Sequence, residues 1–268
     1  MKISILLPYK ENFSSKYAGA VSLFVKDTTI CSKFKNSINI FGYTQYKSKL
    51  LSNYINLNIK KSVVRSNSKI YVDKFLEYEK NESSDLIEIH NRPNYVKLLF
   101  ENSSAKLVLY FHNDPLTMNG SKYLNERKEL FNKTHKLVFN SKWSRDRFLQ
   151  GFNINDVEMN KFTVIYQSAK KVKIDFNKKK NIISFVGKLN TAKGYDLFGL
   201  AIIRILDKYK DWKAIVIGDE PREKHIFHHK NLKILGFKTH NFVLKNFNIA
   251  NIAVVCSRWD EPFGRTSL

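Results

Sequence analysis

The sequence predicts an α/β protein built from two Rossmann-like domains. Short β-branched runs alternate with longer helix-like segments along the whole chain, which is the pattern of parallel sheets covered by helices. This alternation occurs in two series, and a basic segment at residues 170–180 separates them. A length of 268 residues also suits two domains of ordinary size better than one.

The first series predicts an N-terminal domain over residues 1–169. Strand-like runs lie at residues 3–7, 38–41, 85–90, 106–112, 136–140 and 162–165. A helix is expected at residues 17–29, entered through Gly19, and another at residues 142–152, where Ser141 caps it. Residues 47–54 and 73–80 are predicted as shorter helical pieces.

The second series predicts a C-terminal domain over residues 181–268, after a linker at residues 170–180. Strands are expected at residues 182–186, 213–217, 232–235 and 252–255, and helices at residues 194–209 and 242–250. The last of these strands has no covering helix after it in the sequence. We therefore expect the second domain to be incomplete.

The charge of the chain favours anionic partners. The formal net charge is +22, and a basic surface attracts phosphorylated substrates, anionic lipid or nucleic acid. The alternative is a compositional bias, since the lysines are dispersed and Asn and Ile are also abundant. No recognisable nucleic-acid-binding motif accompanies the charge, so nucleic acid is not an expected partner.

Several function classes lack a sequence signal. No apolar run reaches transmembrane length, and residues 3–7 are too short for a signal-peptide core. Cys31 and Cys256 have neither metal-binding nor redox spacing, which favours the reduced cytoplasm. His225, His228 and His229 are close in sequence but lie in a polar loop, so a metal site is not expected there.

The last eight residues carry the strongest functional signal. Glu261, Pro262, Phe263 and Gly264 follow the predicted strand at residues 252–255, where a parallel sheet presents ligand sites. Gly264 permits close backbone approach, and the N–H groups after it begin a helix whose positive end favours an anion. Glu261 can accept hydrogen bonds from neighbouring hydroxyls. A polyol attached to a phosphate fits this site.

A second signal follows the first strand of the C-terminal series. Lys188 and Lys193 lie in a short loop that opens a helix at Gly194. Two ammonium groups and a helix N-terminus can together neutralise a diphosphate without a metal ion. The alternative is an ordinary solvated loop in a lysine-rich protein.

Taken together, these motifs resemble the retaining glycosyltransferases of family 4, which have the GT-B fold. Residues 185–194, Phe-Val-Gly-Lys-Leu-(x)3-Lys-Gly, are similar to that family's Gly-Arg-Leu…Lys-Gly loop. Residues 261–264 resemble the start of its Glu-(x)7-Glu motif. The segments at residues 88–93, 110–115 and 138–144 resemble its strand ends that face the cleft.

The resemblance implies transfer of a hexosyl group from a nucleotide-sugar to a glycan or lipid-linked acceptor, with anomeric configuration kept and without a metal or other cofactor. The donor would bind the second domain and the acceptor the first. It further implies roles for single residues: Lys188 and Lys193 at the diphosphate, Glu261 with the N–H groups of Phe263 and Gly264 at the sugar, Gly19 near the diphosphate, and His112 in the sugar pocket beside the transferring bond.

Three positions depart from the family pattern. Lys188 stands where the family has an arginine, which keeps the charge and loses the bidentate fork. Gly19 lies between two alanines, where many members carry paired glycines. The second motif glutamate would fall one position beyond Leu268, so we expect a C-terminally truncated chain, and its activity without that glutamate stays open.

Some alternatives remain open. The helix at residues 142–152 contains Trp143, Arg147 and Phe148, and it either meets an anionic membrane or packs its aromatic residues inward. We expect an enzyme of lipopolysaccharide or capsule synthesis in the cytoplasm, peripheral on the inner face of the membrane. The rival functions are a non-catalytic sugar-nucleotide or glycan-binding protein and a basic nucleic-acid-binding protein. His90 and Asp114 are weaker candidates than His112, and Asp114 is predicted to be a turn or cap residue.

Overall fold

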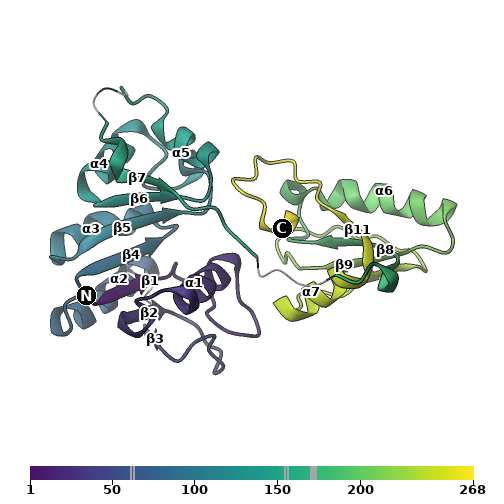
Figure 1. Cartoon of the computed structure of the whole chain (residues 1–268), viewed down its shortest axis with the longest axis horizontal. Coiled ribbons are helices and arrows are strands. Elements are labelled where there is room, and N and C mark those ends of the chain that lie inside the picture. Colours follow the sequence, from purple (N-terminus) through teal and green to yellow (C-terminus); the bar gives the residue numbers. More distant parts are fainter. Residues whose placement is uncertain (61, 63, 154, 156, 170–173) are drawn as a thin grey trace. The chain divides into compact units, whose positions relative to one another are not determined.

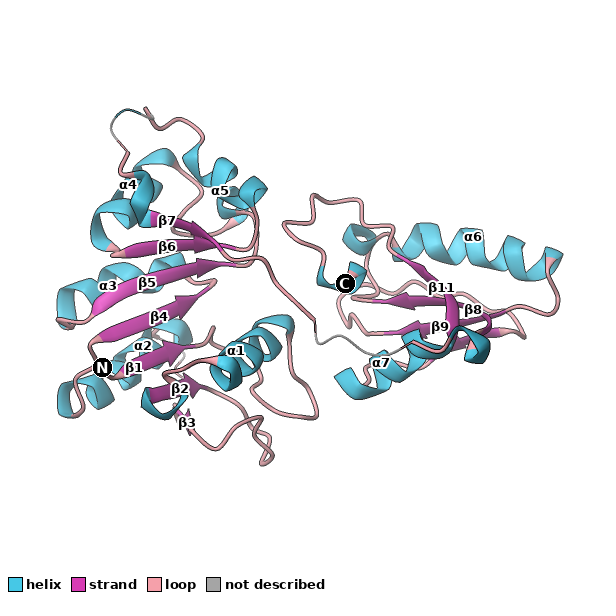
Figure 2. Ribbon diagram, in the orientation of Figure 1, coloured by secondary structure: helices cyan, strands magenta, loops and turns pink. Residues whose placement is uncertain are grey.

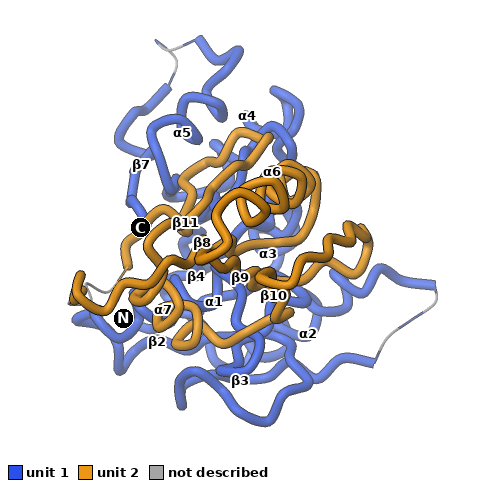
Figure 3. Tube along the Cα trace, turned by 90° about the vertical axis from the view of Figure 1, so that its right-hand side faces the viewer, with its two compact units in different colours: residues 1–167 blue, residues 168–268 orange. Residues whose placement is uncertain are grey.

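The computed structural model describes residues 1–60, 62, 64–153, 155, 157–169 and 174–268. The chain divides into two compact units, unit 1 at Met1–Gln167 and unit 2 at Ser168–Leu268 (Figures 1 and 3). Of the predicted linker at residues 170–180, residues 170–173 lie outside the described part. Each unit contains a parallel sheet with helices packed on it, which confirms the predicted α/β class with Rossmann-like domains.

Unit 1 contains a seven-stranded parallel sheet with the order β3-β2-β1-β4-β5-β6-β7 (Figure 2). Its strands are β1 (Ile3–Leu6), β2 (Ile38–Gly42), β3 (Tyr54–Asn56), β4 (Leu86–His90), β5 (Lys106–Phe111), β6 (Lys136–Phe139) and β7 (Phe162–Val164). Its helices are α1 (Ala20–Cys31), α2 (Asn67–Asn81), α3 (Val96–Asn102), α4 (Leu124–Lys133) and α5 (Lys142–Leu149).

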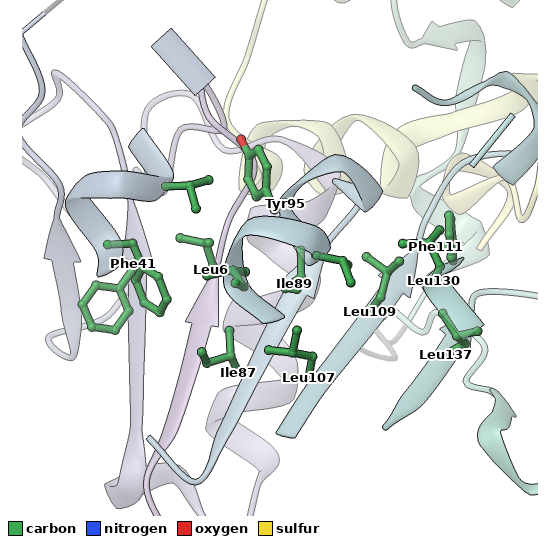
Figure 4. Close-up of a cluster of buried hydrophobic side chains, with 14 of the residues drawn as sticks. Leu6, Phe41, Ile87, Ile89, Tyr95, Leu107, Leu109, Phe111, Leu130 and Leu137 are labelled. Carbon is green, nitrogen blue, oxygen red and sulfur yellow. The ribbon is translucent and has the colours of Figure 1, made fainter. Parts of the chain in front are cut away.

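Both faces of this sheet are buried, because successive strand residues point to opposite sides. On one face, Leu6 and Ile89 belong to a cluster that α2, α3 and α5 cover. Figure 4 shows this cluster, with Ile87, Leu107 and Leu109 of β4 and β5 lying side by side. The opposite face carries Ile3, Ile5 and Leu7, which pack against Val21, Phe24 and Val25 of α1. Burial on both faces explains why these strands are mostly apolar in the sequence.

The prediction of a helical piece at residues 47–54 is wrong. Residues 47–53 form bends and turns, and Tyr54 begins β3, which pairs in parallel with β2. The ring of Tyr54 stacks on Phe13 with centroids 5.1 Å apart and is buried against the sheet. Packing of this ring on the growing sheet edge overrides the weak local helical preference. The sequence prediction also omitted α3 and α4.

Unit 2 contains a four-stranded parallel sheet with the order β10-β9-β8-β11. Its strands are β8 (Lys180–Val186), β9 (Lys213–Ile217), β10 (Leu232–Ile234) and β11 (Ala250–Val254), and its helices are α6 (Tyr195–Lys208) and α7 (His240–Ile249). The apolar side chains of Phe198 and Ile202 on α6 pack on Ile183 and Phe185 of β8. On the other face, Asn246 of α7 is hydrogen-bonded to Ser184.

The two sheets share one topological feature that places the candidate site. In unit 1 the first strand, β1, lies between β2 and β4; in unit 2 the first strand, β8, lies between β9 and β11. The strand order reverses beside each of these first strands. In open α/β sheets, ligands bind in the crevice at the carboxyl ends of the strands at such a reversal. The loops after β1 and β4, and those after β8 and β11, therefore lie where ligands are expected to bind.

Candidate functional site

In unit 2, Lys193 and Glu261 form an ion pair at the point where the strand order reverses. Lys193 ends a 3₁₀ turn that follows β8, and Glu261 lies in the loop after β11. Both side chains are about one quarter exposed, at 26% and 24%. The Lys193 ammonium group also lies 4.9 Å from the ring centroid of Trp259. The structure thus brings together two residues that the sequence assigned to the same ligand.

The environment of Glu261 keeps its carboxyl group ionised. Burial by itself raises the pKa of Glu261, but hydrogen bonds from Lys193, Ser257 and Trp259 outweigh that effect and lower the pKa below its ordinary value. The Ser257 hydroxyl donates to Oε1 of Glu261 at 2.7 Å. A carboxylate held in this way is ready to accept further hydrogen bonds from ligand hydroxyls.

Backbone contacts between the two loops hold this pair in place. Gly194 has a φ of 70°, and a Cβ added there would overlap the carbonyl oxygen of Cys256. The backbone N–H of Arg258 donates to the carbonyl of Ala192 at 2.9 Å. The Asn190 side chain accepts from the backbone N–H of Lys193 at 3.0 Å. The absence of a side chain at residue 194 therefore lets the loops after β8 and β11 touch.

Lys188 has a different carboxylate neighbour from Lys193. Hydrogen bonds from Arg222 lower the pKa of Glu220 to about 2, and the charge of Lys188 makes a smaller contribution in the same direction. The Arg222 guanidinium donates to both carboxylate oxygens of Glu220, at 2.7 and 2.8 Å. Glu220 follows β9, so this charged cluster also lies at the carboxyl end of the sheet.

Phe263 and Gly264 lie on the same loop as Glu261. Gly264 has a φ of 75°, a left-handed conformation that favours glycine, and it precedes a 3₁₀ turn at Arg265–Ser267. The helix expected after Gly264 is therefore a single tight turn over the described residues. The backbone N–H of Ser267 donates to the Gly264 carbonyl at 2.9 Å and closes that turn.

In unit 1, the ring of His112 lies at the ends of β4 and β5 with both nitrogens engaged. Its Nε2 is 3.0 Å from Nδ1 of His90, and its Nδ1 is 3.2 Å from Nε2 of Gln167. The backbone N–H of His112 donates to Oδ1 of Asn91 at 3.2 Å, and its carbonyl accepts from Nδ2 of Asn140 at 2.9 Å. The ends of three neighbouring strands thus converge on one residue that the sequence singled out.

Gly19 lies before the first turn of α1, as predicted, and a carboxylate of the same chain faces that turn. Oε1 of Glu11 accepts from the backbone N–H of Ser22 at 3.0 Å. A Cβ at residue 19 would overlap the Glu11 carboxyl group. Burial raises the pKa of Glu11, although the hydrogen bond from Ser22 and the charge of Arg92 oppose that rise. The positive end of α1, which the resemblance assigned to a diphosphate, therefore holds the Glu11 carboxyl group in this structure.

Helix α5 packs its phenylalanine inward. Phe148 is fully buried, while Arg147 donates to both carboxylate oxygens of Asp114 and lies 5.5 Å from the ring centroid of Trp143. Asp114 also accepts from the backbone N–H of Leu116 at 3.0 Å, so it is a cap residue as predicted. Arg147, on the polar side of this helix, thus serves contacts within unit 1.

The described residues contain neither a membrane-spanning helix nor a cluster of metal-ligating side chains. None of their helices has both the length and the apolar character that crossing a membrane requires. Likewise, within the part of the chain that the structure describes, no three His, Cys, Asp or Glu side chains are grouped so that they could hold a metal ion.

The sequence interpretation missed several side chains of the site. Gln167 and Glu11 were not singled out, because their partners His112 and Ser22 lie 55 and 11 residues away and no local pattern connects them. Asn91 and Asn140 belong to quoted motifs without an assigned role. Their position could have identified them. Each is the first residue after a strand, where polar side chains reach the edge of the sheet.

Comparisons with known proteins address the fold of the chain and the family of its C-terminal part. Residues 167–268 match the family model "Glycosyl transferases group 1". No curated protein sequence matches the chain significantly. Among solved structures, the chain resembles Anabaena Alr3699/HepE in complex with UDP-glucose, with a TM-score of 0.68, 15% identity and coverage of 99% of this chain and 77% of that one.

Two further structures have the same fold. Sucrose-phosphate synthase from Thermosynechococcus elongatus has a TM-score of 0.73 at 13% identity, with coverage of 99% of this chain and 78% of that one. WaaG, a glycosyltransferase involved in lipopolysaccharide biosynthesis, has a TM-score of 0.62 at 12% identity, with coverage of 96% and 76%. The chain therefore has the two-domain α/β fold of GT-B glycosyltransferases, and its residues 167–268 are similar to glycosyl transferases group 1.

Proposed function

We propose that the protein is a retaining glycosyltransferase of family 4 that transfers a sugar from a nucleotide-sugar donor to a glycan or lipid-linked acceptor. The single observation that carries this proposal is the Lys193–Glu261 ion pair where the strand order of unit 2 reverses. It joins a cation suited to a diphosphate with a carboxylate suited to sugar hydroxyls. The family match over residues 167–268 covers both residues.

In this proposal, Lys193 neutralises the negative charge that develops on the diphosphate as it leaves the sugar. Glu261 orients the sugar by accepting hydrogen bonds from its hydroxyl groups, with the N–H groups of Phe263 and Gly264 beside it. Lys188 supplies further positive charge at the same sheet edge. No metal ion is required, because the two ammonium groups perform the neutralisation that a divalent cation would otherwise supply.

Binding of the donor must rearrange the ion pair. Lys193 and Glu261 satisfy each other in the structure, so a diphosphate has to compete with the carboxylate for the ammonium group. The sugar hydroxyls then replace the hydrogen bonds that Glu261 loses. A nucleotide without a sugar would leave Glu261 without its Lys193 partner, which favours the complete donor over the free nucleoside diphosphate.

We further propose that the acceptor is anionic and is used in surface polysaccharide or lipopolysaccharide synthesis. The net charge of +22 supports an acceptor or a membrane surface that bears phosphate groups. WaaG, which has the same fold, is described as involved in lipopolysaccharide biosynthesis, and this likeness supports the same class of product. In this proposal the enzyme acts in the cytoplasm, at the inner face of the membrane.

The test measures donor binding and donor turnover separately. Thermal unfolding of the chain is followed with UDP-glucose, GDP-mannose and ADP-glucose, and release of nucleoside diphosphate is then measured with and without EDTA. We expect one nucleotide class to stabilise the wild type, EDTA to have no effect, and Lys193→Ala to weaken binding at least tenfold. Lys245→Ala is the matched control, because Lys245 is an exposed lysine on α7, outside the loops that carry Lys193 and Glu261.

The outcomes separate the claims. If no nucleotide-sugar stabilises the chain, or if Lys193→Ala binds like Lys245→Ala, the donor site is wrong. Binding without any turnover would reject the transferase and leave a nucleotide-sugar-binding protein. Activity that EDTA abolishes would reject the metal-free mechanism.

A further inference from the structure

We infer that His90 and Gln167 are positioning residues that hold His112 in a single neutral tautomer, so that His112 orients groups in the proposed reaction and does not transfer a proton. This inference rests on the proposed function for its kinetic consequence. Its structural part concerns unit 1 alone, because all of the side chains involved lie between Met1 and Gln167.

The hydrogen-bond chain fixes where the protons lie. The amide nitrogen of Gln167 is 3.2 Å from Nδ1 of His112, and an amide nitrogen can only donate. Nδ1 of His112 therefore accepts, and the ring proton must be on Nε2. That proton points to Nδ1 of His90 at 3.0 Å, so His90 in turn carries its proton on its own Nε2.

The hydrogen-bonded series ends at a carboxylate. Nε2 of His90 lies 3.5 Å from Oε2 of Glu88 and has no closer hydrogen-bond partner among the described residues. Glu88 and His90 are two residues apart on β4, so they point to the same face of the sheet. Gln167 thus donates to His112, His112 donates to His90, and the remaining ring proton of His90 points toward Glu88.

Packing keeps both rings in this arrangement. His90 is 1% exposed, and it stacks on Tyr110 with centroids 4.6 Å apart. The two histidine rings stack on each other at 5.3 Å, and Phe24 of α1 meets His112 edge-on at 5.0 Å. Rotating either ring by half a turn would break the hydrogen bonds of this series. It would leave buried ring nitrogens without a partner, which costs about 1–3 kcal/mol for each group.

The same bonds make His112 a poor general base. Accepting a proton at Nδ1 would point an N–H at the donating amide of Gln167, and accepting one at Nε2 is blocked by the proton already there. The backbone of His112 is held on both sides by Asn91 and Asn140. The ring is thus held in one orientation, and its polar edge is fixed with it.

The test combines a spectroscopic and a kinetic measurement on the full chain. Long-range ¹H–¹⁵N correlation spectra of the ¹⁵N-histidine-labelled protein report which ring nitrogen carries the proton. We expect an Nε2–H tautomer for His112 and for His90 in the wild type. Gln167→Glu replaces the donating amide by an acceptor of the same shape, and it should move the His112 proton to Nδ1 or produce a doubly protonated ring.

The kinetic prediction separates positioning from binding. Gln167→Glu and His90→Leu should each lower kcat about tenfold or more, which corresponds to about 1.4 kcal/mol, with the donor KM changed less than threefold. His90→Asn keeps an acceptor near the position of Nδ1 and should recover most of the activity lost in His90→Leu. Gln150→Glu, at an exposed glutamine of the same unit, is the matched control and should behave like the wild type.

Each outcome decides one of the two claims. An Nδ1–H tautomer or a charged ring for His112 in the wild type overturns the inference, and so does an unchanged kcat in Gln167→Glu with a shifted tautomer. If the wild type turns over no nucleotide-sugar but shows the expected tautomers, the proposed function fails and the hydrogen-bond assignment stands. A spectrum of His90→Asn that retains the His112 tautomer distinguishes positioning from loss of folding.

Discussion

Lys193 and Glu261 lie 68 positions apart in the sequence and are joined as an ion pair that Ser257 and Trp259 also support. Each residue follows a different strand, and the two strands, β8 and β11, are neighbours in the sheet. The pair is therefore a product of the topology. It also gives the carboxyl group of Glu261 a pKa that depends on the ammonium group of Lys193.

Lys193→Met should raise the pKa of Glu261. Burial favours the protonated carboxyl group, and without Lys193 less opposes it. Because the pKa in the folded wild type is lowered, the pair stabilises the fold above the ordinary carboxyl pKa and loses this effect as the pH falls through the lowered value. The difference in stability between the wild type and Lys193→Met should thus be present at pH 7 and disappear in acid.

Carboxyl ¹³C titration of the labelled full chain measures this shift directly. Lys245→Met removes an exposed lysine from the same unit and should leave the titration of Glu261 unchanged. A Glu261 titration that is the same in both variants would show that the ion pair does not form in solution.

The central strands of unit 1 could be predicted from the sequence because their sheet is buried on both faces and their residues are mostly apolar. The elements that were missed or wrong lack this signal. Helix α3 has only seven residues, and β3 is a three-residue strand at the sheet edge that depends on the stacking of Tyr54 on Phe13. Local preference does not determine such elements, because their stability comes from residues distant in sequence.

The same distinction applies to the candidate site. Lys193, Glu261 and His112 were found because each stands at a strand end inside a motif, and parallel strands bring such ends to one edge. Which side chain pairs with which was not predictable. The contact of His112 with Gln167 and the position of Glu11 at the start of α1 arise from the packing of loops, which leaves no periodic pattern in the sequence.

Gly194→Ala should destabilise unit 2 much more than Gly236→Ala. Both glycines are left-handed, with φ of 70° and 67°, so alanine costs about 1–2 kcal/mol of backbone strain at either position. Only at residue 194 does the added Cβ overlap a backbone atom, the carbonyl oxygen of Cys256; at residue 236 nothing lies within 4 Å. We expect a further loss of about 2 kcal/mol or more for Gly194→Ala, since overpacking typically costs about 1–3 kcal/mol.

Denaturant unfolding of the two variants gives this difference without a correction for backbone strain, because that term cancels. Gly194→Ala should also weaken donor binding, since moving Cys256 displaces the loop that carries Glu261. Equal losses of stability in the two variants would show that the loops after β8 and β11 are not in contact.

Glu11→Gln should stabilise the protein at neutral pH. The pKa of Glu11 is raised by burial, so the carboxyl group favours the folded state below its ordinary pKa and loses that contribution as the pH rises through the raised value. Glutamine keeps an acceptor for the N–H of Ser22 and carries no charge. We expect a gain of about 1 kcal/mol at pH 7.5, or about 2–4 °C in Tm, and no gain at pH 4.

Thermal unfolding of both proteins between pH 4 and pH 8 tests this sign. Glu101→Gln is the control, because Glu101 is an exposed glutamate of α3. A wild type that is more stable than Glu11→Gln at neutral pH would mean that the ionised carboxylate is the favoured partner of α1.

Asn140→Ala should destabilise unit 1 and disturb His112 together. The buried amide of Asn140 donates to the His112 carbonyl at 2.9 Å and accepts from the Ser144 hydroxyl at 2.7 Å. Removing it leaves two buried polar groups without these bonds, at a cost of about 1–3 kcal/mol for each. Asn102 is the control: its exposed amide donates to the Leu98 carbonyl at 2.9 Å, and Asn102→Ala should cost no more than about 0.5 kcal/mol.

Because the Asn140 bond holds the backbone of His112 and the Gln167 bond holds its ring, Asn140→Ala should lower kcat while the Nε2–H tautomer of His112 persists in the spectrum. A tautomer that changes in Asn140→Ala would show instead that backbone and ring are held as one unit.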